Sequence, residues 1–136
     1  MFKGTGILQY DPKARIRFDP WWLILKTDEQ IVKYYQYWIL KYYAAKFEKT
    51  VWGSHVSVIR GSEPKHKNLW KKYQGKKIEF SYDNNIYQAN PKFLCINAYS
   101  EELQHIREEL GLSPIPPYGF HITIGRLHPT TINKNE

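Results

Sequence analysis

The sequence predicts an α+β domain in which two helices pack on one face of a sheet. Short segments rich in β-branched and aromatic residues precede and follow each of two helical segments, which is typical of this class. The chain has 136 residues, enough for one hydrophobic core and little more. We therefore expect a single domain over residues 1–128 and a frayed polar tail over residues 129–136.

The first half of the chain contains three predicted strands and one long helix. The helix starts after the second strand, where the side-chain oxygen of Thr27 or Asp28 can accept from the free amides of the first turn. Apolar residues then recur every three or four positions to about Phe47, as in a helix lying on a sheet, so its aromatic residues are expected to pack in the core. The predicted strands are Gly4–Tyr10, Trp21–Lys26 and His55–Arg60.

The second half contains a short helical turn around Asn68–Tyr73, four predicted strands and a second helix. Asp83-Asn84-Asn85 is a run of turn-forming residues and favours a hairpin between the first two of these strands. Ser100 can cap a helix over residues 101–110, and Gly111 suits the left-handed conformation that ends a helix. The four strands are Lys76–Tyr82, Ile86–Ala89, Phe93–Tyr99 and His121–Arg126.

The composition favours an anionic ligand that contains bases. Lys and Arg outnumber Asp and Glu by 20 to 13, the net charge is +7, and 16% of the residues are aromatic. Cations attract phosphates and exposed rings stack on bases, so we expect a nucleotide or nucleic-acid partner. No apolar run approaches the roughly 20 residues of a membrane span, and no secretory signal is apparent. With Cys95 as its single cysteine, the chain is expected to be cytoplasmic, with no disulfide, thiolate metal cluster or membrane partner.

Two hexapeptides repeat one pattern 66 positions apart. They are His55-Val56-Ser57-Val58-Ile59-Arg60 and His121-Ile122-Thr123-Ile124-Gly125-Arg126. β-Branched residues at the second and fourth places favour strands, whose side chains alternate between two faces. Each strand therefore presents a histidine and a hydroxyl on one face and an apolar row on the other. On regular strands the two arginines would point away from the hydroxyls and form strand-end salt bridges, unless bulges at Ile59 and Gly125 turn them.

Two histidines that face one site suit the cleavage of a phosphodiester. One neutral imidazole removes the proton from a 2′-hydroxyl or a water, and the other, protonated, gives a proton to the leaving oxygen. Imidazole titrates near pH 6.5, so both states are accessible without a metal. Ser57 and Thr123 would donate hydrogen bonds to the phosphate oxygens. A zinc site is disfavoured because neither motif carries a third ligand; the alternative is that both histidines are ordinary polar residues of a strand.

The paired His-x-Ser/Thr strands resemble the 2H phosphoesterase superfamily, whose members carry two such motifs on central strands of a compact, bilobal, RNA-ligase-like α+β fold. The resemblance implies antiparallel sheets, two main helices, and a phosphodiesterase that acts without a cofactor on 2′-5′ or 3′-5′ linkages or cyclic phosphates. Ser57 stands where threonine is common, and it supplies the same hydroxyl donor. The residues to which the resemblance assigns catalytic roles are His55, Ser57, His121 and Thr123.

A closer resemblance, to compact phage proteins of the anti-CBASS type, covers nearly the whole chain. It implies cleavage of the 3′-5′ bonds of cyclic di- or trinucleotide signals of bacterial antiphage defence, in the cytoplasm of a host cell. The alternatives are a 2H enzyme that processes linear RNA ends or 2′,3′-cyclic phosphates, and a non-catalytic protein that sequesters nucleotides. The segments that carry the resemblance are Phe2–Gly6, Tyr10–Pro12, Trp21-Trp22, His55–Gly61, Gly75–Tyr82 and Gly119–Thr123.

A lysine-rich segment supplies candidate substrate-binding residues. Residues 65–77 contain six lysines and no acid, with Trp70 and Tyr73 between them. Trp70 would stack on a base, and Lys71 and Lys72 would contact phosphates. Tyr10 is a fourth predicted substrate contact. The alternative for the segment is a solvated loop and helix face.

Overall fold

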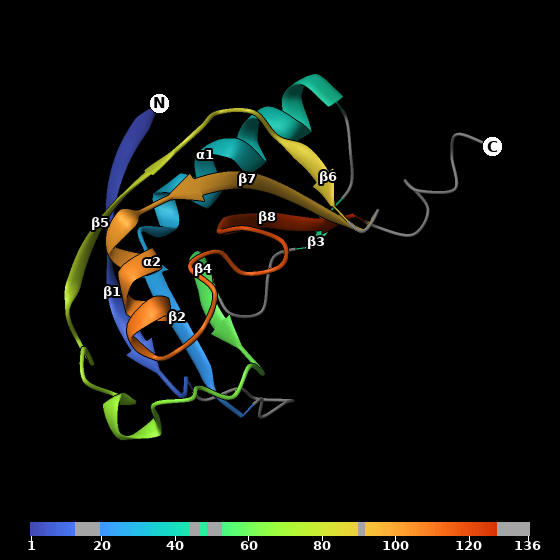
Figure 1. Cartoon of the computed structure of the whole chain (residues 1–136). Coiled ribbons are helices and arrows are strands. Elements are labelled where there is room, and N and C mark those ends of the chain that lie inside the picture. Colours follow the sequence, from blue (N-terminus) through green and yellow to red (C-terminus); the bar gives the residue numbers. More distant parts are fainter. Residues whose placement is uncertain (13–19, 44–46, 49–52, 90–91, 128–136) are drawn as a thin grey trace.

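The computed structural model describes residues 1–12, 20–43, 47–48, 53–89 and 92–127 (Figure 1). The strands are β1 (Phe2–Tyr10), β2 (Trp22–Thr27), β3 (Phe47–Glu48), β4 (His55–Arg60), β5 (Lys77–Tyr82), β6 (Tyr87–Ala89), β7 (Phe93–Tyr99) and β8 (His121–Leu127). The helices are α1 (Glu29–Trp38), which continues as a π-helical turn over Ile39–Tyr43, a 3-10 turn over Lys67–Leu69 and α2 (Glu101–Glu109). Within these ranges no helix is long and apolar enough to cross a membrane. The expected tail at 129–136 lies outside the described residues.

The described strands form one antiparallel sheet that closes on itself. Their order is β3-β8-β4-β2-β1-β5-β7-β6, and β8 also pairs with β7. This last pairing joins β8, β4, β2, β1, β5 and β7 into a ring that resembles a small barrel (Figure 1). The predicted α+β class with an antiparallel sheet and two main helices is therefore confirmed.

The ring consists of two halves with the same order of elements. In the first half β1 and β2 pair, α1 follows, and β4 pairs with β2. In the second half β5 and β7 pair, α2 follows, and β8 pairs with β7. The halves meet at β1–β5 and at β4–β8. The two motif strands, β4 with His55 and β8 with His121, therefore lie side by side although 66 residues separate the motifs in the sequence.

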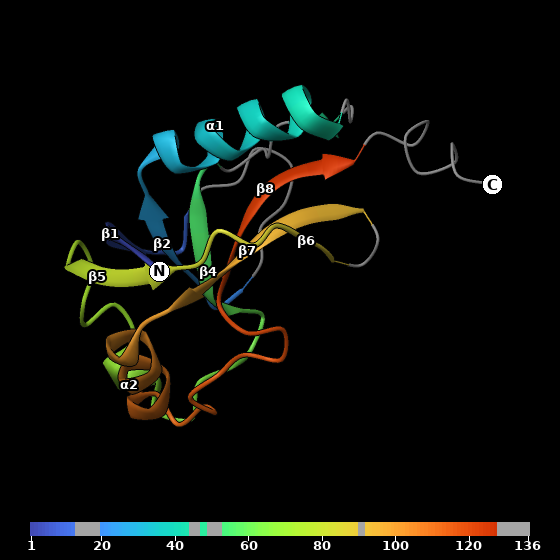
Figure 2. The same cartoon turned by 90° about the horizontal axis from the view of Figure 1, so that it is seen from above.

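One hydrophobic core lies on the face of the sheet that both helices cover. Figure 2 shows α1 and α2 at opposite sides of the ring. Val32 of α1 and Ile106 of α2 nevertheless belong to the same buried cluster as Val56 of β4 and Ile122 of β8. The apolar rows of the two motif strands thus face the helices, and the histidines alternate to the other face.

The first helix begins where expected and ends earlier than expected. Asp28 caps it, because its Oδ1 accepts from Gln30 N at 2.9 Å. The prediction that this helix reaches Phe47 is wrong, since helical structure is described only to Tyr43 and Phe47 lies in β3. The backbone of Phe47 pairs instead with Leu127 on the open edge of β8. The backbone hydrogen bonds gained by this pairing outweigh the helical spacing of the apolar residues.

The predicted hairpin between β5 and β6 is also wrong. Both strands pair with the same edge of β7, with Tyr82 opposite Ala98 and Tyr87 opposite Cys95. The turn residues between β5 and β6 therefore do not reverse the chain, and the two strands run in the same direction along β7. Asp83 explains this, because its carboxylate accepts from Asn85 N at 3.2 Å and from the Tyr99 hydroxyl at 3.1 Å, which keeps the turn on β7.

The second helix follows the prediction closely. Ser100 Oγ accepts from Leu103 N at 3.2 Å. Gly111 ends the helix with a φ of 84°, and a side chain there would strike Lys65. The structure has a 3-10 turn over Lys67–Leu69 where a short helical turn around Asn68–Tyr73 is expected.

Candidate active site

The two motifs occupy neighbouring antiparallel strands. Val56 of β4 is in register with Ile122 of β8, and both are fully buried. The residues before and after each of them alternate to the opposite face of the sheet. That face carries the four predicted catalytic residues, all half-buried: His55, Ser57, His121 and Thr123.

Each histidine is anchored to the backbone in the same way. Nδ1 of His55 lies 3.0 Å from the carbonyl oxygen of Gly53, and Nδ1 of His121 lies 3.3 Å from that of Gly119. A carbonyl can only accept, so Nδ1 carries the hydrogen and Nε2 is left with its lone pair for another partner. Both glycines have a positive φ, 72° and 68°. The repeated pattern therefore begins with a glycine two residues before each histidine, outside the two hexapeptides.

An acidic residue that sequence reasoning missed holds the turn before His55. Glu29, the first residue of α1, accepts from Ser54 N at 2.8 Å. The Ser54 and Thr27 hydroxyls lie 2.5 Å apart, and Thr27 N donates to Ser54 O at 2.9 Å. These contacts fix the backbone that presents the Gly53 carbonyl to His55.

The surroundings of His55 favour its neutral form. Burial lowers the pKa of His55, and the positive charges of Arg60 and His121 lower it further, against the opposing effects of the Gly53 carbonyl and Glu29. The two histidines flank the register pair Val56 and Ile122 on the same face of neighbouring strands. His55 is therefore suited to accept a proton at neutral pH.

Both motif strands carry a bulge after the hydroxyl residue. On β4, Ser57 is opposite Ile24 and Ile59 is opposite Leu23, so Val58 is an extra residue. On β8, Thr123 is opposite Cys95 and Gly125 is opposite Leu94, so the next residue, Ile124, is likewise extra. An extra residue shifts the alternation by one position beyond it. Val58 and Ile59 accordingly both point into the core.

The bulges turn both arginines toward the face of the histidines. Arg60 is in register with Trp22, and its guanidinium lies 5.0 Å from the centre of the Trp22 ring. The Trp22 ring in turn lies 6.5 Å from the imidazole of His55. Arg126 is exposed and in register with Phe93 of β7. Phe93 is two residues before Cys95, the partner of Thr123, so Arg126 lies on the same face as Thr123. The expectation that the arginines point away from the hydroxyls is therefore wrong, and the stated exception of a bulge holds in both strands.

Two of the four predicted substrate contacts pack against other aromatic side chains. Tyr10 is buried, and its ring lies 4.9 Å from that of Trp70. Trp70 also packs against Trp21 at 5.2 Å, and its Nε1 donates to Asp11 at 3.1 Å. Trp21 O accepts from Gly61 N at 3.3 Å, so this cluster lies at the Arg60 end of β4.

The two lysines that were predicted to contact substrate have carboxylate partners. Nζ of Lys71 lies 3.5 Å from Asp11, and Nζ of Lys72 lies 2.6 Å from Glu109 of α2. Lys71, Asp11 and Trp21 all have positive φ values, 71°, 50° and 55°. Such strained backbone is often found near functional sites, although these contacts by themselves explain the segment as a structural one.

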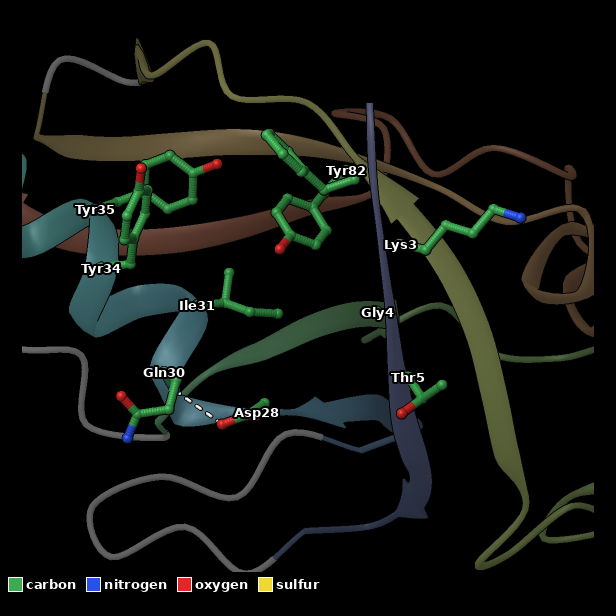
Figure 3. Close-up of a pocket in the computed structure, with 10 residues that line it drawn as sticks. Lys3, Gly4, Thr5, Asp28, Gln30, Ile31, Tyr34, Tyr35 and Tyr82 are labelled. Carbon is green, nitrogen blue, oxygen red and sulfur yellow. Dashed lines mark hydrogen bonds between the residues drawn. The ribbon is translucent and has the colours of Figure 1, made fainter.

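A cavity of about 480 Å³ lies apart from the motif residues, between the start of α1 and β1 (Figure 3). Tyr34, Tyr35 and Tyr82 border it, and Figure 3 shows them grouped on the side of the cavity away from Asp28. Burial raises the pKa of Tyr35 to about 12. None of the four motif residues lines this cavity, so it is separate from the candidate active site.

Among the described residues, no three His, Cys, Asp or Glu side chains gather closely enough to hold a metal ion. The site instead combines two imidazoles, two hydroxyls and two arginines from strands that lie side by side. No protein-family model, curated protein or solved structure matches the chain. A function therefore has to be inferred from the site itself.

Proposed function

We propose that the chain is a metal-independent phosphodiesterase that cleaves the 3′-5′ bonds of cyclic di- or trinucleotides to linear products. The observation that supports this most is the matched anchoring of His55 and His121, each with Nδ1 on a glycine carbonyl and Nε2 available. Binding a phosphate needs donors only, whereas a pair of ring nitrogens that can accept and donate a proton suits transesterification.

The reaction uses the 2′-hydroxyl of the substrate as nucleophile. His55, kept neutral by its surroundings, takes the hydroxyl proton while the 2′-oxygen forms a bond to the adjacent phosphorus. The bond from phosphorus to the 5′-oxygen breaks, and protonated His121 gives its proton to that oxygen. The product is a linear oligonucleotide with a 2′,3′-cyclic phosphate, and the two histidines have exchanged protonation states.

The remaining groups of the site stabilise the charge that develops on the phosphate. The hydroxyls of Ser57 and Thr123 donate to its non-bridging oxygens. Arg60 and Arg126, turned to this face by the bulges, add positive charge that does not depend on pH in the working range. Both effects act on the transition state, where the negative charge is greatest.

A cyclic oligonucleotide is the substrate class that we favour over linear RNA. The net charge of +7 attracts a phosphodiester ring, and the resemblance to anti-CBASS phage proteins points to the same class. In that role the enzyme would act in the cytoplasm of an infected bacterium and lower the concentration of a defence signal. Processing of linear RNA ends is the competing enzymatic activity.

The experiment that tests the proposal compares matched ribose and 2′-deoxyribose substrates. Cyclic dinucleotides, cyclic trinucleotides and short RNA are incubated with the protein in EDTA, and the products are identified by mass spectrometry. The cyclic ribonucleotides should be opened and their 2′-deoxy counterparts should remain intact. Cleavage of the 2′-deoxy ring at a similar rate would identify water as the nucleophile, and loss of turnover in EDTA would contradict a metal-independent reaction.

Variants of the histidines separate catalysis from sequestration. His55→Ala and His121→Ala should each lower kcat by about 10²–10⁴-fold while largely retaining ligand binding. His105→Ala is the matched control, because His105 is an exposed residue of α2 and belongs to neither motif. A protein that binds cyclic nucleotides tightly but shows no turnover in any form would be a sequestering protein instead.

A further inference from the structure

A β-bulge leaves its extra residue outside the regular hydrogen-bond ladder of the paired strands. The extra residues, Val58 on β4 and Ile124 on β8, are fully buried, so their carbonyls have no access to water. A buried carbonyl without a donor destabilises the folded state. The two bulges therefore require donors from inside the core.

The structure supplies one buried side chain for each of these carbonyls. Nη1 of Arg107 donates to Val58 O at 2.8 Å, and Nε2 of Gln36 donates to Ile124 O at 2.9 Å. Arg107 is 4% exposed and Gln36 is 8% exposed. Polar residues are rarely buried to this extent without a specific hydrogen bond, and these two bonds reach the two equivalent residues of the repeat.

Arg107 is held by carbonyl groups alone. Its Nε donates to Ser113 O at 2.7 Å in addition to the bond to Val58, and no carboxylate of the described residues pairs with it. Burial lowers the pKa of its guanidinium. A helix residue that served only to pack would be apolar here, as Leu103 and Ile106 of the same helix are.

Each of these two donors belongs to one half of the ring and bonds to a strand of the other half. Gln36 belongs to α1 of the first half and supports β8 of the second, whereas Arg107 belongs to α2 of the second half and supports β4 of the first. If Gln36 or Arg107 is replaced by a residue without a donor, the motif strand can satisfy the free carbonyl by pairing regularly, without an extra residue. Regular pairing returns the side chains after the bulge to the opposite face of the sheet. The support therefore decides on which face each arginine of the motif strands lies.

We propose that Gln36 and Arg107 are positioning residues that hold the two bulges and thereby aim Arg126 and Arg60, respectively, at the substrate phosphate. The proposal rests on the proposed function for the identity of that phosphate. It assigns to two core residues, far from one another in the sequence, a specific effect on anion binding at the opposite face of the sheet.

Double-mutant cycles test this assignment. The affinity for inorganic pyrophosphate is measured by calorimetric titration without metal ions, in Arg107→Met and Gln36→Met, alone and combined with Arg60→Ala or Arg126→Ala. Arg107→Met should weaken binding several-fold when Arg60 is present and have no further effect in Arg60→Ala, while its effect persists in Arg126→Ala. Gln36→Met should show the mirror pattern, coupled to Arg126 and independent of Arg60.

Two further variants keep the test decisive. Gln30→Met, an exposed position on the same helix as Gln36, should leave the affinity unchanged. Arg107→Lys retains a donor and should keep most of the affinity even if Arg107→Met folds poorly. Equal losses of affinity in both arginine backgrounds, or folded Arg107→Met protein with unchanged affinity, would overturn the proposal.

The same experiment separates this proposal from the proposed function. Pyrophosphate binding requires no turnover, so the coupling pattern can be found even if no cyclic nucleotide is cleaved, and the positioning role would then stand without the enzymatic one. Cleavage of cyclic nucleotides with no coupling between these residue pairs would contradict the positioning role alone.

Discussion

His55 and His121 share a backbone anchor but not the same surroundings. Glu29 fixes the turn before His55 through Ser54, and Arg60 lies near its ring across Trp22. The charge of Arg60 is one of the causes that lower the pKa of His55, after burial. At the scale of single residues, this difference is the basis on which the proposed function assigns the role of base to His55 and that of acid to His121.

Removal of the Arg60 charge should change the pH dependence of the reaction. The pKa of His55 lies below its ordinary value near 6.5, so the acid limb of kcat/KM should lie below pH 6.5 in the native protein. Arg60→Met removes one of the charges that disfavour the imidazolium, so the acid limb should move to higher pH. Profiles of kcat/KM against pH, with Lys65→Met as an exposed control, measure this. An acid limb that does not move would show that the charge of Arg60 does not contribute to the pKa of His55.

The lysine-rich segment contains residues that should respond differently to substitution. Trp70 packs between Tyr10 and Trp21, so Trp70→Ala should lower the free energy of unfolding by about 2–3 kcal/mol, somewhat less than a fully buried tryptophan. Lys71 is exposed, and Lys71→Ala should raise KM while kcat and stability stay nearly constant, as expected for lost ground-state binding. Urea denaturation and steady-state kinetics separate the two effects. An unchanged KM in Lys71→Ala would show that Lys71 has no role in binding beyond its contact with Asp11.

At the scale of elements, the glycine turns before the motif strands are as much part of the site as the strands. Gly119 has a φ of 68°, and nothing lies within 4 Å of where its Cβ would be. Alanine there would be strained without a clash, and the strain falls on the carbonyl that holds His121. Gly75 has a φ of 80° and equally open surroundings, but it anchors no histidine.

These two glycines form a matched pair for a prediction. Gly119→Ala and Gly75→Ala should each cost about 1–2 kcal/mol of unfolding free energy, because both place a Cβ in the left-handed region. Only Gly119→Ala should also lower kcat, since it disturbs the orientation of the His121 ring. The measurements are urea denaturation and kcat for both variants. Equal activity in the two proteins would argue that the glycine carbonyl does not orient the imidazole.

Local signals predicted the elements better than their connections. Ser100 and Asp28 act as helix caps because capping depends only on neighbouring residues. The pairing of Phe47 with β8 depends on an edge formed 80 residues later in the chain, which no local pattern contains. The residues around Asp83 correctly indicate a turn, but they do not indicate which strand β6 pairs with. That depends on β7, with which β6 pairs.

The bulges show the same limit within a single strand. On β4 the adjacent apolar residues Val58 and Ile59 break the strict alternation, and this break was a readable signal of an extra core-facing residue. On β8 the corresponding position is Gly125, which has no side chain and leaves no such signal. The donors Gln36 and Arg107 could not be identified from the sequence, since each acts on a strand of the other half.

At the scale of the whole molecule, His55 should make stability depend on pH. In the unfolded chain His55 titrates near pH 6.5, whereas its pKa in the folded protein is lower. Below about pH 6.5 the unfolded chain binds a proton that the folded chain does not, so the free energy of unfolding falls as pH drops toward the folded pKa. Above pH 6.5 this contribution to stability is fully present.

Urea denaturation between pH 8 and pH 5 measures this effect. The native protein should lose more stability over this range than His55→Gln, in which the titrating group is absent. His105→Gln, at an exposed position, should behave like the native protein. Identical pH slopes in the native protein and His55→Gln would show that His55 titrates alike in the folded and unfolded states.

The closure of the ring at β4 and β8 has a consequence for how the site comes apart. These strands are in register only at Val56 and Ile122, whereas β4 with β2 and β8 with β7 are in register at five residue pairs each. Local opening should therefore begin at the β4–β8 contact and separate the two histidines while each half keeps its own pairing. A phosphate bound by both strands would stabilise the β4–β8 contact, so under the proposed function the substrate would stabilise the closed form of the ring that holds the two histidines together.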